Sequence, residues 1–292
     1  MIQNKKPTKD ISKDDIENKL YKVCSKRSKR VVKINNRISF GNGDLNIIAG
    51  PNGVESRKLI HKTASFLNSI GVKILRGHVF KPLTFPYRSS QYSESGVKGL
   101  EWLKEVKSEY KMTIVSEITE MQYFDKMLET IDIFQIGTRN MQNFELVREV
   151  ARSKKPIILK RHFGSSLRDL LGAAEHILYE GNYKLILCER GISAPHTHRE
   201  TSRYLLDIQA IPALKELTNF PIISDPSHAS FWAPWVPSLA YASVAAGVDG
   251  LIIETHPNPS KSKVDPLQPL NFNVFKKVHK NIKSLHKLTE KF

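Results

Sequence analysis

Cysteine is scarce in this chain, and long apolar runs are missing. Of the 292 residues, only Cys24 and Cys188 are cysteines, too few for a disulfide framework. The sequence contains no run of about 18 consecutive apolar residues and no signal-type segment. These absences argue against a disulfide-stabilised secreted protein and against a membrane protein, and they predict a cytoplasmic location by default.

Acidic residues are few relative to basic ones. The chain has 45 lysines and arginines against 29 aspartates and glutamates, a formal net charge of +16. This balance suits anionic ligands, but it also fits nucleic acid or a membrane surface. The excess is spread over surface helices and both termini, without a basic face interleaved with aromatic residues. We therefore expect neither nucleic acid nor a membrane as a partner.

The length fits either one large α/β barrel or two ordinary domains, because 40% hydrophobic content in 292 residues can bury a full core. Residues 1–30 are polar and lysine-rich, and we interpret them as a solvated or weakly helical leader without chemistry. Short apolar runs separated by Asn-Asn and Gly-Asn-Gly follow. They predict a small hairpin that closes the bottom of a single domain at residues 31–292.

From Leu45 onward, apolar runs of strand length alternate with segments of helical periodicity. Strands are predicted at Leu45–Ala49, Lys73–Val79, Thr113–Ile118, Ile133–Ile136, Pro156–Lys160, Lys184–Cys188, Pro221–Ser224 and Gly250–Ile253. Helices are predicted at Arg57–Ser69, Gly96–Tyr110, Glu120–Thr130, Asn143–Ser153, Leu167–Glu180, Ile208–Leu217, Ser238–Ala246 and Val274–Leu288. Eight such units predict a single (β/α)8 TIM barrel. A doubly wound sheet is the alternative, but no GxGxxG turn follows the first strand.

The predicted strands end alike, in charged or amide side chains. The first example is IAGPNGVES at Ile48 to Ser56, and it is followed by ILRGHVFKPLT, IFQIGTRN, IILKR, LILCERG, IISDPSH and LIIETHP. In a TIM barrel the carboxyl ends of the strands gather at one mouth, where active sites lie. The sequence therefore predicts one shared rim of polar side chains.

Cations dominate that rim. The set comprises Arg76, Lys81, Arg139, Lys160, Arg161 and Arg190, beside Glu117, Gln135 and Glu189. Clustered guanidinium and ammonium groups repel one another unless phosphate or carboxylate offsets them, so the set predicts a multiply anionic ligand. The alternative for any single member is a pair with a neighbouring acid or a position at the solvated edge.

A second cluster consists of Asn52, His228, Glu254 and Asp265. An imidazole and two carboxylates from different strand ends would bind a divalent metal if the fourth group were a thiolate or another good donor. Here the fourth group is an amide, which binds transition metals weakly. The alternative is that the cluster holds water and moves protons through hydrogen bonds. Cys188, inside an apolar strand, is interpreted as a core residue.

The motifs resemble one enzyme family. GPNGVES, RGHVFKPLT, QIGTRNMQNF, ILKR, ILCERGI, LDIQAIPALKEL, DPSHA and ETHP occur, between about Val31 and Phe272, in the order of the class I phosphoenolpyruvate-dependent aldol-type synthases. This family includes the 3-deoxy-D-arabino-heptulosonate 7-phosphate (DAHP) and 3-deoxy-D-manno-octulosonate 8-phosphate synthases. RNMQNF, CERGI, PALKEL and DPSHA resemble the β-type DAHP synthases without an appended regulatory domain.

The resemblance implies that Arg76, Lys81, Arg139, Lys160 and Arg190 hold phosphoenolpyruvate, with Glu117 and Gln135 nearby. It implies a reaction that joins the methylene carbon of phosphoenolpyruvate to an aldose aldehyde and releases phosphate. Lys160 is the expected proton donor to the aldehyde oxygen, and His228, Glu254 and Asp265 match the metal or water site of the family. The resemblance also implies a homo-oligomer, either a tetramer or a dimer.

Two positions depart from the family pattern. Asn52 stands where metal-dependent members carry cysteine, so we expect an enzyme without a metal cofactor; a divalent manganese, zinc or iron ion is the alternative. Leu83, in KPLT, stands where the heptulosonate members carry an arginine that binds the phosphate of erythrose 4-phosphate. Arg88 is the candidate substitute, and with Thr84 it completes the predicted acceptor side.

Three functions therefore stay open. The first is a DAHP synthase or a variant with an altered aldose acceptor. The second is a synthase of octulosonate or another 3-deoxy-ulosonate in a specialised pathway. The third is a catalytically silent protein that binds phosphoenolpyruvate.

Overall fold

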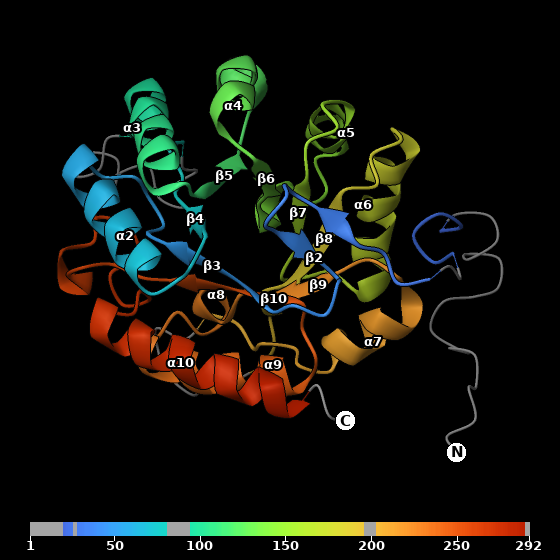
Figure 1. The fold of residues 1–292 in the computed structure, drawn as a ribbon. Helices are drawn as coiled ribbons and strands as arrows, with labels where there is room; N and C mark the ends of the chain where they lie inside the picture. The colour runs from blue at the N-terminus through green and yellow to red at the C-terminus, as the bar shows by residue number, and fades with distance from the viewer. Residues whose placement is uncertain (1–19, 26–27, 81–93, 196–202, 290–292) are drawn as a thin grey trace.

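The barrel predicted from the alternation of strands and helices is present. The computed structural model describes residues 20–25, 28–80, 94–195 and 203–289. In these ranges parallel strands close into a barrel in the order β10-β3-β4-β5-β6-β7-β8-β9 (Figure 1). The strands are β3 (Asn46–Gly50), β4 (Ile74–Arg76), β5 (Thr113–Ile118), β6 (Ile133–Ile136), β7 (Ile157–Lys160), β8 (Leu185–Glu189), β9 (Ile222–Ser224) and β10 (Gly250–Glu254).

Helices surround the barrel (Figure 1). They are α2 (Arg57–Ser69), α3 (Gly96–Tyr110), α4 (Phe124–Thr130), α5 (Phe144–Arg152), α6 (Leu167–Tyr179), α7 (Ala210–Leu217), α9 (Val236–Ala245) and α10 (Phe272–Thr289). Every predicted helix is present, with ends that differ by up to two residues apart from the predicted start at Glu120. That segment is divided between a 3-10 turn at Met121–Tyr123 and α4. A short helix that was not predicted, α8 (Pro226–Ser230), directly follows β9.

The predicted hairpin closes the bottom of the barrel. Strands β1 (Val32–Lys33) and β2 (Ser39–Phe40) pair antiparallel. Phe40 is fully buried and belongs, with Val32 and Ile38, to the same apolar cluster as the residues that line the barrel interior. The Asn46 amide on β3 donates a hydrogen bond to the Ser39 carbonyl at 2.7 Å. The hairpin thus fills the end of the barrel opposite the carboxyl ends of the strands.

The described part of the leader does not match the prediction of a solvated segment. Leu20 and Val23 are buried, and the amide N–H of Val23 donates to the Glu175 carboxylate on α6 at 2.8 Å. The Thr218 hydroxyl, just after α7, donates to the Val23 carbonyl at 2.6 Å. Two apolar side chains and their satisfied backbone groups anchor this segment outside α6 and α7, whereas its composition alone predicted a polar tail.

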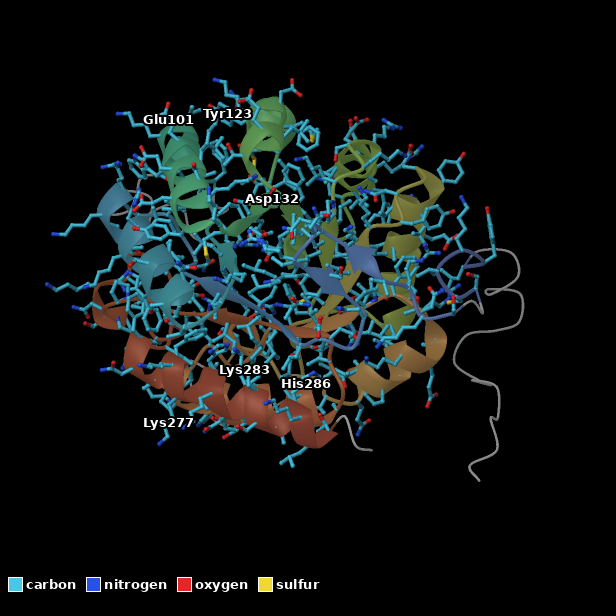
Figure 2. The ribbon with its side chains drawn as sticks, in the orientation of Figure 1. Glu101, Tyr123, Asp132, Lys277, Lys283 and His286 are labelled. Atoms are coloured by element: carbon cyan, nitrogen blue, oxygen red, sulfur yellow. The ribbon has the colours of Figure 1, made fainter. Side chains whose placement is uncertain are left out.

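Much of the positive charge lies on solvent faces of helices. On α10 the buried residues Phe275, Val278 and Ile282 recur at helical spacing, whereas Lys277 is exposed and points away from the barrel (Figure 2). No helix in the described ranges is both long and apolar enough to span a membrane.

Gly50, at the end of β3, provides a test of how tightly the barrel end is packed. Its φ is +145°, and an added Cβ would lie 2.2 Å from the carbonyl oxygen of Arg76 on β4. Because a backbone oxygen cannot move aside cheaply, we expect Gly50→Ala to lower the free energy of unfolding by about 1–3 kcal/mol. The matched change Gly172→Ala in α6, with no atom within 4 Å of the new Cβ, should raise it by about 0.5–1 kcal/mol. Chemical denaturation measures the free energy of unfolding of both variants. Equal changes in the two variants would contradict the close contact between Gly50 and the Arg76 carbonyl.

His279 should make stability depend on pH. Burial of this α10 side chain lowers its pKa from 6.5 to about 4, and the charge of Lys283 adds to the effect. Between these values the unfolded chain binds a proton that the folded protein does not, so stability rises with pH by up to about 1.4 kcal/mol per unit. In His279→Leu the slope between pH 4 and 6.5 should decrease, whereas any packing cost persists at pH 8. Denaturation across this pH range measures the slope of the free energy of unfolding against pH. An unchanged slope in His279→Leu would contradict the lowered pKa of His279.

Candidate active site

Strand geometry places the polar side chains inside the barrel mouth, which we define as the end formed by the carboxyl ends of the strands. Side chains two residues apart share a face of a strand. The interior cluster includes Ile74, Val115, Ile133, Ile158 and Ile252. The residues two positions later are Arg76, Glu117, Gln135, Lys160 and Glu254, all buried. Each of these five strands therefore changes from apolar to polar on its interior face as it reaches the mouth.

Arg76 is the most deeply placed cation of the mouth. Its side chain is 0% exposed, and its Nη2 donates to Asn52 Oδ1 at 2.7 Å. The carboxylate of Glu254 lies 4.0 Å from Nη1. Among the described residues neither Nε nor Nη1 has a hydrogen-bond partner. Buried N–H groups of a guanidinium cost free energy when they lack an acceptor, so this arrangement favours an anionic ligand.

Lys160 is paired with a carboxylate that the sequence analysis did not select. Its ammonium group contacts Asp225, which directly follows β9 and is fully buried. Burial opposes ionisation of Asp225, but His228 and Lys160 outweigh it and hold the pKa of Asp225 well below its usual range. Burial lowers the pKa of His228 well below 6.5. Asp225 raises this pKa, whereas the positive charges of Lys160 and Arg76 lower it further. The group is therefore a charged Lys–Asp pair beside a neutral imidazole.

Two further cations differ in what they contact. The Arg190 guanidinium is buried 4.4 Å from the ring centroid of Tyr204, and its Nη2 donates to the His228 carbonyl at 3.2 Å. In the described part of the chain its Nη1 has no hydrogen-bond partner. Arg139 lies in the turn Thr138–Asn140 after β6 and is exposed. Gln135 donates to Glu117 at 3.3 Å.

Arg161 is a predicted ligand-binding residue whose side chain contacts several protein groups. Its Nη1 lies 2.9 Å from both Glu189 Oε2 and Asp207 Oδ2, and its Nε donates to the Ser165 carbonyl at 3.1 Å. Burial raises the pKa of Glu189, and Arg161 opposes that rise. For a single cation, the sequence analysis gave a pair with a neighbouring acid as the alternative to ligand binding. The contacts of Arg161 match that alternative and indicate mainly a structural role.

The predicted metal or water cluster forms two contact pairs in the mouth, Asn52 with Asp265 and His228 with Glu254. Asn52 Nδ2 donates to Asp265 Oδ2 at 2.9 Å, while Asp265 Oδ1 lies 3.3 Å from Arg203 Nη2. His228 Nε2 lies 4.0 Å from Glu254 Oε2, which also accepts from Gln268. Asp265 has a left-handed φ of 48° although it is not glycine. Strain of this kind concentrates at functional sites.

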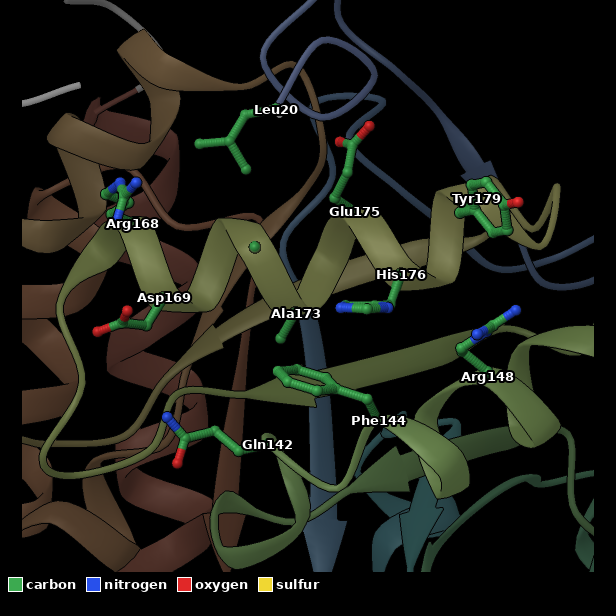
Figure 3. A pocket seen from close by; sticks show the side chains of 11 residues that line it. Leu20, Gln142, Phe144, Arg148, Arg168, Asp169, Ala173, Glu175, His176 and Tyr179 are labelled. Atoms are coloured by element: carbon green, nitrogen blue, oxygen red, sulfur yellow. The ribbon is translucent and has the colours of Figure 1, made fainter. Parts of the chain in front are cut away.

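A separate hollow lies away from the mouth. It measures about 620 Å³ and lies on the outer surface at α5 and α6, where Phe144 stacks on His176 at 4.3 Å between ring centroids (Figure 3). None of the predicted site residues lines it. The hollow is therefore separate from the candidate active site.

Comparisons with known proteins agree on the family. The model of the DAHP synthetase I family matches residues 29–291. The chain belongs to the DAHP synthetase I family.

Individual relatives fall in both branches of the family. The phospho-2-dehydro-3-deoxyheptonate aldolase of Thermotoga maritima is 42% identical over 85% of this chain and 72% of its own length. The 2-dehydro-3-deoxyphosphooctonate aldolase of Francisella tularensis subsp. holarctica is 29% identical over 79% of this chain and 86% of its own. The crystal structure of the Thermotoga enzyme superposes with a TM-score of 0.82 at 39% identity, covering 89% of this chain and 74% of that one.

In this member of the DAHP synthetase I family the donor set does not fit a divalent metal. Both ends of the Asn52 amide are hydrogen-bonded, one to the Arg76 guanidinium and one to Asp265. A second guanidinium, from Arg203, lies against Asp265. Nowhere in the described ranges do three or more His, Cys, Asp or Glu side chains gather closely enough to hold an ion. The Asn52 amide and the Asp265 carboxylate thus already contact each other and two guanidinium groups, where a metal would need their oxygen atoms.

Some predicted residues cannot be placed, and some placed residues were not predicted. Lys81, Leu83, Thr84 and Arg88 lie outside the described residues. The mouth residues that the prediction missed are His78, Asp225, Arg203 and Gln268. Asp225 directly follows β9 and His78 lies two residues after the end of β4, so the rule that selected their neighbours would have found them. Arg203 and Gln268 lie in loops, where no periodicity points to them.

Two arginines of the mouth should behave differently on substitution. Arg161→Gln leaves Glu189 buried without its cation, and we expect a loss of about 3–5 kcal/mol in the free energy of unfolding. Arg139→Gln alters an exposed side chain, so we expect a change within about 0.5 kcal/mol and weaker binding of phosphoenolpyruvate. Denaturation and ligand titration of both variants test the contrast. Equal stability of the two variants would contradict the structural role of Arg161.

Proposed function

We propose that this protein is a phosphoenolpyruvate-dependent aldol-type synthase that makes a 3-deoxy-ulosonate, foremost 3-deoxy-7-phosphoheptulonate. The observation that carries the proposal is the convergence of Arg76, Lys160 and Arg190 inside the barrel mouth, with buried N–H groups of both arginines lacking acceptors among the described residues. The phosphate and carboxylate of phosphoenolpyruvate supply the negative charge that this arrangement requires. Family membership agrees with this chemistry.

The reaction needs stabilisation of opposite charges at two atoms. The methylene carbon of phosphoenolpyruvate bonds to the aldehyde carbon of an aldose, and the aldehyde oxygen takes a proton. Water then adds at the enol-ether carbon, and phosphate leaves from the resulting hemiketal. Fixed charges that are in place before the reaction stabilise such a transition state without reorganisation. The buried side chains of the mouth meet this requirement because protein contacts hold them in position.

Lys160 and His228 have complementary parts in this scheme. Asp225 holds the ammonium group of Lys160, which we propose donates the proton to the aldehyde oxygen. His228 is neutral near pH 7, because burial lowers its pKa, and its Nδ1 faces Asp225. We propose that its Nε2, on the side of Glu254, accepts a proton from the attacking water, with Asn52 and Asp265 orienting that water.

We propose that the reaction proceeds without a metal. The support is the hydrogen-bonded Asn52 amide between Arg76 and Asp265, and the Arg203 guanidinium against Asp265. In this arrangement fixed cations supply positive charge beside the carboxylates.

The identity of the acceptor is the finer question. Leu83 stands where the family resemblance implies an arginine that binds the phosphate of the aldose. A charge-assisted hydrogen bond of this kind contributes about 1.5–3 kcal/mol. The heptulosonate activity therefore requires another cation, for which Arg88 is the candidate, and an altered aldose is the second function that we propose. Homo-oligomerisation and a cytoplasmic location stay predictions.

The decisive test is turnover with a chelator present. Purified protein in EDTA, given phosphoenolpyruvate and erythrose 4-phosphate, should release inorganic phosphate and form a 3-deoxy-ulosonate. Lys160→Met should lower kcat by at least about 100-fold, because it removes the proton donor. Release only with other aldoses would select the altered acceptor, and release only after addition of a divalent metal would contradict the metal-free reaction. Binding of phosphoenolpyruvate without turnover on any aldose would identify a silent homologue.

A further inference from the structure

Tyr204 lies against Arg190, one of the buried cations of the mouth. The central carbon of the Arg190 guanidinium, Cζ, lies 4.4 Å from the centroid of the Tyr204 ring. The face of an aromatic ring attracts a cation placed over it, and the attraction is stronger away from water. Arg190 is only 4% exposed. The Tyr204 ring therefore stabilises a guanidinium that is otherwise costly to bury.

The protein holds Tyr204 in a defined place. Its backbone N–H donates to the Ala229 carbonyl at 3.2 Å, and the Phe163 ring stacks on its ring with 5.0 Å between the centroids. Gly191 directly follows Arg190 at a φ of +97°, and a Cβ at this position would lie 2.8 Å from Tyr204 Cβ. Glycine at position 191 therefore allows Tyr204 to approach the chain at Arg190.

An aromatic ring differs from an acid as the partner of an arginine. Carboxylates accept hydrogen bonds from the guanidinium N–H groups, as Glu189 and Asp207 do from Arg161. A ring attracts the positive charge without offering an oxygen acceptor, so the N–H groups stay able to donate. Arg190 Nη2 donates to the His228 carbonyl, and within the described ranges Nη1 has no hydrogen-bond partner. The ring thus stabilises the charge of Arg190 without using the N–H groups that an anion would need.

Two buried carboxylates compete for the same guanidinium. Burial lowers the pKa of Arg190, and the negative charges of Asp225 and Glu189 oppose that effect. Both carboxylates therefore lie near enough to attract Arg190. Without the ring, the guanidinium can turn toward one of them, and its N–H groups would then donate to the protein instead of to a ligand. Tyr204 favours the arrangement in which Arg190 can bind an anion without first being reoriented.

We propose that Tyr204 is a positioning residue, which holds the Arg190 guanidinium in place for an anionic group of phosphoenolpyruvate through a cation–π interaction. This inference rests on the proposed function. The hydrogen bonds to the ligand belong to Arg190, and Tyr204 acts through that side chain. A change in the electrons of the ring should therefore change the affinity for phosphoenolpyruvate.

Packing of the loop around Tyr204 is the competing explanation. Fluorine withdraws electrons from the face of an aromatic ring and changes its size very little. Phenylalanine at position 204, followed by phenylalanines that carry one, two and three fluorine atoms, should weaken the cation–π attraction in steps. Packing predicts no such trend, because the shape of the ring is kept.

The experiment is calorimetric titration with phosphoenolpyruvate, with thermal denaturation to establish that each variant is folded. We expect Tyr204→Phe to bind within about threefold of wild type, because the ring face is kept. The affinity should then fall with each added fluorine atom. Tyr204→Leu, without a ring, should bind about 5- to 30-fold more weakly than wild type. Equal affinities across the fluorinated series would overturn the inference, and this series decides the question if Tyr204→Leu does not fold.

Tyr183→Leu is the matched control. The Tyr183 ring also lies against an arginine, with 4.9 Å between its centroid and Cζ of Arg30. Tyr183 precedes β8, so this contact lies at the end of the barrel opposite the mouth. Its affinity for phosphoenolpyruvate should stay within about twofold of wild type. A loss equal to that in Tyr204→Leu would also overturn the inference.

The wild-type titration separates the inference from the proposed function. If wild type fails to bind phosphoenolpyruvate, the proposed function falls together with the role of Tyr204. If wild type binds and the affinity does not follow the fluorinated series, only the role of Tyr204 falls.

Discussion

The structure of the mouth depends on cations held inside the barrel with fewer negative partners than they need. Removing a guanidinium from water is costly unless acceptors surround it. Arg76 is completely buried, yet its described contacts are an amide oxygen at 2.7 Å, the His78 ring at 3.2 Å and a carboxylate no closer than 4.0 Å. The fold tolerates this because the barrel interior and the hairpin below it bury a large apolar core. The unsatisfied groups then favour an anion that brings its own acceptors.

The buried cations of the mouth divide into two kinds, and the division affects which of them can bind a ligand. Lys160 and Arg161 contact buried carboxylates, which fix their positions and limit how far they can follow a ligand. Arg76 and Arg190 keep N–H groups that lack hydrogen-bond partners in the described part of the protein. These N–H groups can therefore donate to a ligand. A rigid Lys–Asp pair thus lies beside arginine N–H groups without described partners, and both are in place before any ligand binds.

The sequence was sufficient for the barrel and for most of the mouth, because both follow from local patterns. Apolar strands at regular intervals fix the eightfold alternation, and a period of two places Arg76, Glu117 and Lys160 on the interior face. Contacts between distant segments were not accessible in this way. The pairing of Lys160 with Asp225 and the approach of Arg203 to Asp265 depend on loops and on a left-handed backbone at Asp265. The burial of Val23 was missed for a similar reason, since the Glu175 carboxylate that accepts from the Lys22 and Val23 N–H groups lies about 150 residues further along the chain.

Thermal denaturation of the wild-type protein with increasing phosphoenolpyruvate tests the central claim most directly, because a ligand that binds only the folded state raises the melting temperature with its concentration. Pyruvate and inorganic phosphate, each carrying one of the two anionic groups, serve as comparisons. If the buried donors require one ligand with both groups, phosphoenolpyruvate should raise the melting temperature more than either fragment at the same concentration. No rise, or a rise that inorganic phosphate reproduces in full, would contradict the account.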